Sequence, residues 1–217
     1  LASGLQHTPE IMVVKAQGEI MKMAGIVEEM FNHFTHIFLN PTKKLGKKVE
    51  ELKEMENYTD DMQEEISGFL VKCSADNVND KTTQNINAMM RIVSELESIG
   101  DSCYNLILLA QRRYEKKIRF PEEAVQEVEP YLHLVNEFLQ FNKERLNNPL
   151  SDEDLRRALD IEYKINEKRN VYKKSSRKRL KSAGHVKREL LYIDFIKHLE
   201  HIGDHSLNIS EALHNLQ

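Results

Sequence analysis

Apolar residues recur every three or four positions along most of this 217-residue chain. In one stretch, the recurring positions are Met89, Ile92, Val93, Leu96, Ile99 and Leu106. This spacing places apolar side chains on one face of an α-helix, which can then be buried. No segment of useful length alternates apolar and polar residues, so the pattern predicts an all-α protein.

A ten-residue pattern, Leu-Glu-x-Ile-Gly-Asp-x-x-x-Asn, occurs twice, at Leu96–Asn105 and at Leu199–Asn208. Each matched residue lies 103 positions from its counterpart, and the surrounding apolar positions keep the same offset. The offset also pairs Leu52, Met62 and Phe69 in the preceding segment with Leu155, Ile165 and Tyr172. The chain is therefore expected to be a duplication, with repeats at residues 1–119 and 120–217.

Helix breakers divide the chain into six long segments. They run from Pro9 to Leu39, from Thr42 to Ser74, from the Ala75–Asp80 loop to Lys117, from Phe120 to Asn147, from Ser151 to Gly184, and from His185 to the end. Short connections make sequential helices antiparallel. We therefore expect two tandem antiparallel three-helix bundles related by a pseudo-twofold repeat.

Two positions mark local helix geometry. Ser151, followed three residues later by Asp154, resembles a capping box at the start of the fifth segment. Pro130 is expected to kink the fourth helix or to shift its start, because proline removes a backbone hydrogen bond and clashes with the preceding turn.

Composition narrows the class of protein. Charged residues make up 30% of the chain, with only eight Gly, five Pro and no Trp, which favours a soluble helical protein. The longest uncharged apolar runs fall far short of the roughly 20 residues that a membrane span needs, and no signal peptide is visible. The two cysteines, Cys73 and Cys103, are too few for a disulfide framework and are expected to be reduced.

Charge is unevenly distributed, although the net charge is only −4. The segment Lys164–Arg188 contains eleven Lys or Arg residues and a single acid, Glu167. Such a block can bind phosphate, an acidic partner or an anionic membrane surface. The alternative is a solvated helix balanced by acidic neighbours. No nucleic-acid partner is expected.

The repeated pattern carries the candidate chemistry. Glu97 and Asp101 lie four residues apart, as do Glu200 and Asp204, so each pair projects from one helix face. Paired carboxylates repel each other unless a cation lies between them, and carboxylate oxygens suit hard or borderline metal ions. An isolated pair of this kind usually faces water, but its recurrence with the same glycine and the same apolar frame favours two metal sites.

The two copies, Glu95–Asp101 and His198–Ile209, resemble the signature helices of the PhoU family. The resemblance covers nearly the whole chain as two three-helix repeats. It implies a non-catalytic regulator of phosphate uptake that carries metal ions on Glu/Asp-x-x-x-Asp pairs of adjacent helices.

The resemblance also implies the ligand sets. Glu97 and Asp101 belong to one site, and Glu200 and Asp204 to the other. The family's companion motif on the preceding helix maps to Glu162–Asn166 in the second repeat. In the first repeat, the same offset reaches the weak ligands Thr59 and Gln63, with Asp60 or Asp61 as substitutes. The arginine that usually follows the motif glutamate is replaced by Ser98 and His201.

The second repeat is therefore expected to hold the better metal site, formed by Glu162, Glu200 and Asp204. The ion is expected to be Fe, Zn or Mg. Histidines could contribute to it, because four of them lie on the last segment: His198, His201, His205 and His214.

The first segment adds a second resemblance. Thr8–Pro9 followed by Lys15–Ala24 is similar to the entry into the cytoplasmic PhoU-like tail of bacterial sodium/phosphate cotransporters. It implies a domain at the inner face of the plasma membrane, covalently joined to a membrane phosphate transporter. The basic segment would then lie against the membrane.

Other functions stay open at this point. The chain could be a free-standing PhoU-type regulator, or a purely structural helical adaptor that binds no metal. A ferritin-like metal-carboxylate enzyme needs two Glu-x-x-His motifs, and only Glu211–His214 qualifies. Association into a homodimer is also left open.

Overall fold

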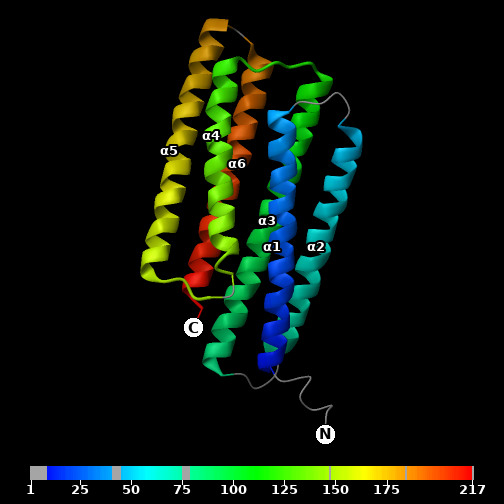
Figure 1. The fold of residues 1–217 in the computed structure, drawn as a ribbon, viewed down its shortest axis with the longest axis vertical. Coiled ribbons are helices and arrows are strands. Elements are labelled where there is room, and N and C mark those ends of the chain that lie inside the picture. Colours follow the sequence, from blue (N-terminus) through cyan, green and yellow to red (C-terminus); the bar gives the residue numbers. More distant parts are fainter. Residues whose placement is uncertain (1–8, 41–44, 75–78, 147, 184, 217) are drawn as a thin grey trace.

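The computed structural model describes residues 9–40, 45–74, 79–146, 148–183 and 185–216. Within these ranges the chain forms six helices and no strand. They are α1 (Pro9–Leu39), α2 (Gly46–Ser74), α3 (Asp80–Glu115), α4 (Glu122–Lys143), α5 (Asp152–Ala183) and α6 (Val186–His214) (Figure 1). The all-α prediction is confirmed. The expected breaks at Pro41, Ala75–Val78, Asn147 and Gly184 lie outside the described residues.

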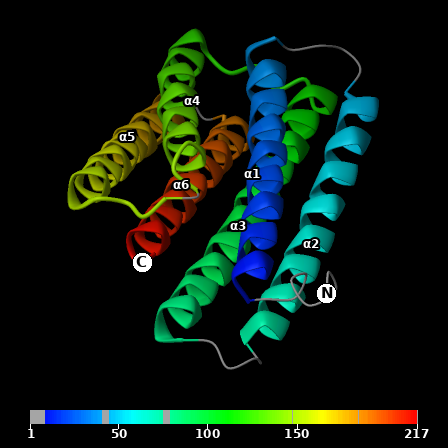
Figure 2. The ribbon, with the colours of Figure 1, turned by 60° about the horizontal axis from the view of Figure 1, so that its bottom comes forward.

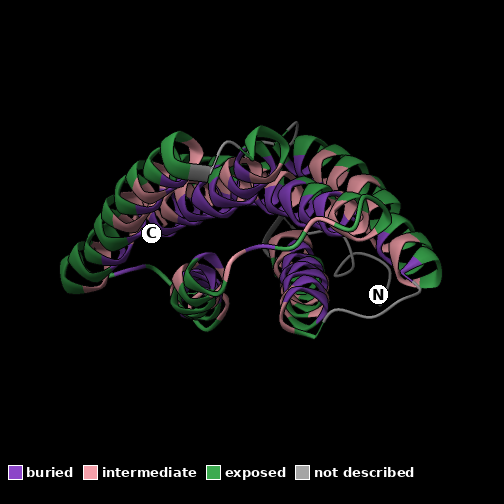
Figure 3. Ribbon diagram, turned by 90° about the horizontal axis from the view of Figure 1, so that it is seen from above, coloured by how far each residue is buried: buried purple, intermediate pink, exposed green. Residues whose placement is uncertain are grey.

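Each helix runs antiparallel to the one that precedes it (Figure 1). Helices α1 to α3 contact one another, α4 to α6 form the second set, and α3 lies against α6 at the centre. Figure 3 shows α5, α6, α3 and α2 as a curved layer with α4 and α1 on its concave side. The tilted view in Figure 2 shows the same order. The predicted pair of antiparallel three-helix bundles is confirmed.

Local signals fix several helix ends. Ser151 caps α5, because its Oγ accepts a hydrogen bond from the backbone N–H of Asp154 at 3.1 Å. The side chain of Asn79 caps α3 in the same way by accepting from the N–H of Thr82 at 2.8 Å. Pro130 does not shift the start of α4, since that helix begins at Glu122 and continues through the proline.

Buried apolar side chains form one continuous core that extends through both repeats. Leu96 and Leu199 hold equivalent places in it, because each is almost fully buried on the central helix of its repeat. The expected boundary at 119/120 falls between α3 and α4. Because both repeats contribute to the same core, the division of the chain into two units stays a prediction.

An aromatic cluster joins the repeats at the end of the molecule where α1 ends and α6 begins. The ring of Phe195 stacks on Phe34 at 5.9 Å and meets the edges of Phe38 and Phe120 at 5.4 and 5.9 Å. These residues come from α1, α6 and the connection before α4. Such pairs add about 0.5–1.5 kcal/mol each beyond the area that they bury.

The motif glycines let neighbouring helices approach closely. A Cβ added at Gly100 would lie 3.2 Å from Oγ1 of Thr59, and one at Gly203 would lie 3.0 Å from Cδ1 of Ile165. Thr59 and Ile165 therefore occupy equivalent places on α2 and α5, and both are fully buried. They are 106 residues apart, whereas Gly100 and Gly203 are 103 apart.

The offset of 103 therefore holds for α3 and α6 but is wrong for α2 and α5. The sequence offset pairs Leu52 with Leu155, which is only half-buried. The structure pairs Leu52 with Ala158, and both are 0% exposed. The helical hairpin of the second repeat is three residues shorter between these equivalent positions, which shifts the register of its first helix. This shift changes which acids of α2 face the motif on α3.

Candidate metal site between α2 and α3

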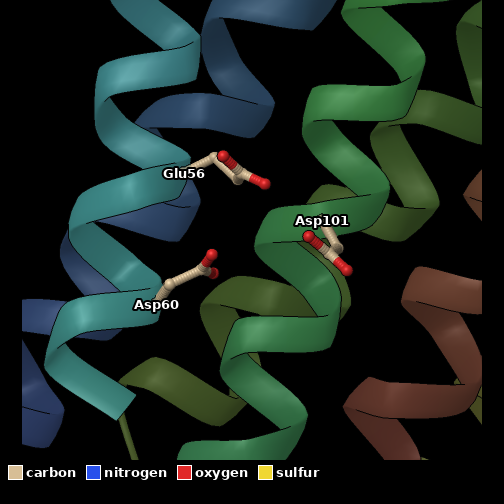
Figure 4. A group of neighbouring side chains, drawn as sticks. All are labelled: Glu56, Asp60 and Asp101. Carbon is tan, nitrogen blue, oxygen red and sulfur yellow. The ribbon is translucent and has the colours of Figure 1, made fainter. Parts of the chain in front are cut away.

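Three carboxylates from two helices converge in the first repeat. Glu56 and Asp60 lie one turn apart on α2 and point toward Asp101 on α3 (Figure 4). One oxygen of each lies within 4.8 Å of the others. In Figure 4, α1 passes behind α2, so this acid cluster lies on the face of the curved layer away from α1. Among the described residues, no other group of acids, histidines or cysteines converges as closely.

Glu97 completes the cluster from the turn of α3 before Asp101. Burial, then Asp101 and Asp60, raise the pKa of Glu97 above its ordinary value. Burial and Asp60 raise the pKa of Asp101 in the same way. Burial and Asp60 also raise the pKa of Glu56, an effect that Lys53 partly offsets. Each of these three shifts disfavours the ionised form of its acid, because the acids are partly buried and lie close to one another.

Two oxygens of the cluster have no hydrogen-bond partner. They are Oε2 of Glu56 and Oδ1 of Asp60, and both are shielded from solvent. Buried polar atoms are nearly always satisfied, so an orphaned pair of carboxylate oxygens is unusual. The residues of the first repeat therefore fit the metal ion that the family resemblance implies.

The donor set indicates the kind of ion. Carboxylate oxygens alone suit hard cations such as Mg²⁺, Mn²⁺ or Fe²⁺, whereas Zn²⁺ more often takes nitrogen or sulfur ligands. A bound cation would offset the mutual repulsion of the acids and join α2 to α3. Glu56, Asp60, Glu97 and Asp101 would hold it.

The second repeat has a different arrangement at the equivalent place. Glu200 is buried and accepts a hydrogen bond from the guanidinium of Arg169 on α5. Glu162 accepts one from the side-chain amide of Asn166. Burial and Asp204 raise the pKa of Glu162, while Arg169 lowers it. Arg169 thus supplies positive charge to both Glu200 and Glu162.

Two histidines of α6 contact groups other than the acids of the second repeat. Nδ1 of His205 lies 2.7 Å from Oε2 of Glu95 on α3. Nδ1 of His214 lies 3.0 Å from the carbonyl oxygen of Leu150. Burial lowers the pKa of both His198 and His201, so their neutral forms are favoured.

Residues at the end of the second motif and just after it bind the two repeats together. Asn208 donates to Glu95 at 3.1 Å and accepts from Arg91 at 3.3 Å. Arg91 also pairs with Glu211 at 2.8 Å. Glu211 of the sole Glu-x-x-His motif is therefore engaged with Arg91, while His214 faces the carbonyl of Leu150. This arrangement counts against a ferritin-like centre.

The predicted site residues are thus divided between two places. In the first repeat, Glu97 and Asp101 lie near Asp60. In the second, Glu162 lies near Asp204, while Glu200 pairs with Arg169. Sequence reasoning named Asp60 as a substitute ligand but missed Glu56 and the role of Arg169. An offset of 106 would have aligned Glu56 and Asp60 with Glu162 and Asn166.

Comparison with known proteins agrees with this fold. Residues 20–110 match the family model described as the PhoU domain. No curated protein matches the sequence. The structure is similar to that of PhoU from Pseudomonas aeruginosa, with a TM-score of 0.84, 18% identity, and coverage of 94% of this chain and 96% of that one. It is also similar to the phosphate transport system regulatory protein PhoU from Streptococcus pneumoniae, with a TM-score of 0.80, 16% identity and 94% of both chains covered.

The fold thus defines a two-repeat helical protein with acidic side chains on its paired helices, α2–α3 and α5–α6. The PhoU domain model matches residues 20–110, and the fold is similar to that of PhoU over almost the whole chain. No helix in the described part of the chain is long and apolar enough to span a membrane.

Proposed function

We propose that this protein is a non-catalytic, PhoU-type regulator of phosphate transport that binds a metal ion in its first repeat. The observation that carries the proposal is the PhoU fold, shared over nearly the full length of both chains, with an acid cluster on its signature helix. The solved structures that the chain resembles are described as PhoU proteins, which supports the PhoU-type regulator as the main reading. We expect it to work in the cytoplasm, where a phosphate transporter presents its inner face.

The metal would act on the structure rather than on a substrate. Without a cation, the acids of α2 and α3 repel each other where the two helices face one another. A cation would offset this repulsion and hold the two helices in one register. With the cation bound, α2 and α3 would present a fixed surface on the convex face of the layer, where a partner can dock.

A direct test compares phosphate uptake in cells with and without the gene. Cells that lack it should continue to take up radiolabelled phosphate in phosphate-rich medium, and the wild-type gene should restore control. The E56Q/D60N/D101N variant, expressed at the wild-type level, should restore little control. If deletion leaves uptake and its dependence on external phosphate unchanged, the proposed function is wrong.

The second proposed contact uses a basic end of the molecule. It surrounds a cavity of about 500 Å³ where α3 ends and α6 begins, lined by Lys117, Ile118, Arg119, His185, Val186, Lys187 and Arg188. We propose that this end meets the anionic inner surface of the membrane. Four cations of the block Lys164–Arg188 are already paired with acids of this chain, namely Lys164, Arg169, Arg179 and Arg188. The contact therefore rests on the remaining, exposed cations.

Vesicle binding tests this contact. The protein should bind phosphatidylserine vesicles, and binding should weaken as salt rises, because a Debye length of about 10 Å at 0.1 M salt screens surface charges. R119E/K187E should weaken binding more than tenfold, at about 1 kcal/mol for each basic residue near the membrane. K81E, at the opposite end of α3, is the matched control. Equal binding by both variants would contradict the proposal.

The cotransporter-tail form stays a second proposal, supported only by the resemblance of Lys15–Ala24 to such tails. The native polypeptide distinguishes the two forms. An antibody against this domain should detect a protein that stays in the soluble fraction if it is free-standing. A much heavier polypeptide that stays in washed membranes would establish the fusion instead.

A further inference from the structure

The place where the acids of paired helices face each other, here called the groove, differs in charge between α2–α3 and α5–α6. Gly100 packs on Thr59 as Gly203 packs on Ile165, so positions 106 residues apart on α2 and α5 are equivalent. By this register, Gln63 is the counterpart of Arg169. Asp60 is likewise the counterpart of Asn166.

These two exchanges change the charge of the groove. The first repeat has four carboxylates, and the side chain at position 63 is neutral. The second repeat has three carboxylates, an amide at position 166 and a guanidinium at position 169. The second groove is therefore less negative by two charges, one from each exchange.

The guanidinium is placed where it neutralises the motif acid. Arg169 donates from Nη1 to Oε1 of Glu200, and the two side chains are only 24% and 11% exposed. Arg169 also lowers the pKa of Glu162 across the groove. Lys173, half-buried one turn further along α5, adds more positive charge on the same side.

We infer that Arg169 takes the place of a metal ion in the second repeat, so that this chain holds its metal in the first repeat alone. This inference deepens the proposed function, on whose metal site it rests. A divalent ion in the second groove would have to displace Arg169 from Glu200 and leave a partly buried guanidinium without its partner. It would also meet the repulsion of that guanidinium, which stays charged at any physiological pH.

The inference gives the two repeats different roles. The α5–α6 pair is held by its own ion pair and is insensitive to metal supply. The α2–α3 pair lacks an internal cation and changes with metal supply. The second repeat is thus a fixed support, and the first is the part of the molecule that responds.

Reciprocal exchanges test this assignment with Mn²⁺, an ion that prefers oxygen ligands. N166D/R169Q gives the second groove the residue types of the first, and it should raise the Mn²⁺ bound per chain about twofold, because metal content follows the available anionic ligands. Q63R places the guanidinium in the first groove. It should remove bound Mn²⁺ and raise the melting temperature of the metal-free protein. Unchanged Mn²⁺ content in Q63R would overturn the inference.

A single substitution keeps the test decisive if N166D/R169Q does not fold. E200Q breaks the ion pair, so it should lower the melting temperature of the metal-free protein while leaving bound Mn²⁺ at the wild-type level. A fall in bound Mn²⁺ would show that Glu200 is a ligand and would overturn the inference alone. If the wild-type protein binds no Mn²⁺, the inference and the metal part of the proposed function both fail, whereas the regulation of uptake is judged separately by gene deletion.

Discussion

Neutralising the three converging carboxylates with E56Q, D60N and D101N should abolish metal binding. Each substitution removes an anionic ligand and keeps the size of the side chain. Loss of supporting groups around a metal already costs 10–100-fold in affinity, so losing three ligands should cost more than about 100-fold. Metal analysis after equilibrium dialysis measures this change directly.

The same variant should also lose its stabilisation by metal. An ion at about 100 times its dissociation constant stabilises the wild-type fold by roughly 2.7 kcal/mol, and the variant should show no such gain. Without metal, the variant should be slightly more stable than wild type, by a few tenths of a kcal/mol for each like-charged pair removed. E162Q/D204N, in the second repeat, is the matched control. If that control loses metal instead, the ligands have been assigned to the wrong repeat.

Replacing Arg179 by methionine should be among the most destabilising single changes in the chain. Its Nε donates to Glu189 at 3.1 Å and its Nη1 donates to Glu127 at 3.0 Å. Glu189 is 1% exposed and also accepts from Ser176 at 2.8 Å. Removing one partner of a buried ion pair costs about 3–5 kcal/mol. Because Arg188 still pairs with Glu189 at 3.1 Å, we expect a loss near the lower end of that range. Typical domains have only about 5–15 kcal/mol of total stability.

Urea unfolding followed by circular dichroism measures this loss. R177M is the matched control, because Arg177 is exposed two residues away and its loss should fall within about 0.5 kcal/mol of wild type. E127Q/R179M/E189I should recover much of the stability. The counterparts of Arg179 and Glu189 in the first repeat are the buried apolar residues Cys73 and Ile86, so this fold accepts an apolar core there. A loss below about 1 kcal/mol for R179M would contradict the assigned role.

The helices and the duplication could be predicted because they depend on local spacing. The apolar stripes that contain Leu96 and Leu199 have the spacing of an α-helix. Ser151 marks the start of α5 by its own hydrogen bond. The offset of 103 followed directly from the repeated motif. These features are encoded within single helices or in identical residues.

The partners of the motif acids could not be predicted in the same way. Which residues of α2 face Asp101 depends on the register between two packed helices, and the contact of Gly100 with Thr59 sets that register. The shorter hairpin of the second repeat displaced the inferred alignment by nearly one helical turn. Thr59, expected as a weak ligand, is instead fully buried against α3.

The pairing of basic residues with buried acids also could not be predicted from the sequence. The block Lys164–Arg188 looks like a continuous basic surface, yet Arg169 and Arg179 point into the second repeat and neutralise Glu200 and Glu189. The ranking of the two metal sites depended on this distinction. The motif of the second repeat is nearer to the family pattern, but the less conventional first repeat has the uncompensated acids.

Anomalous diffraction from crystals soaked in Mn²⁺ tests the central claim most directly. The account predicts a peak between α2 and α3, bounded by Glu56, Asp60, Glu97 and Asp101, and no peak between α5 and α6. A peak at Glu162, Glu200 and Asp204, or the absence of any peak from the first repeat of a crystal that diffracts well, would contradict it.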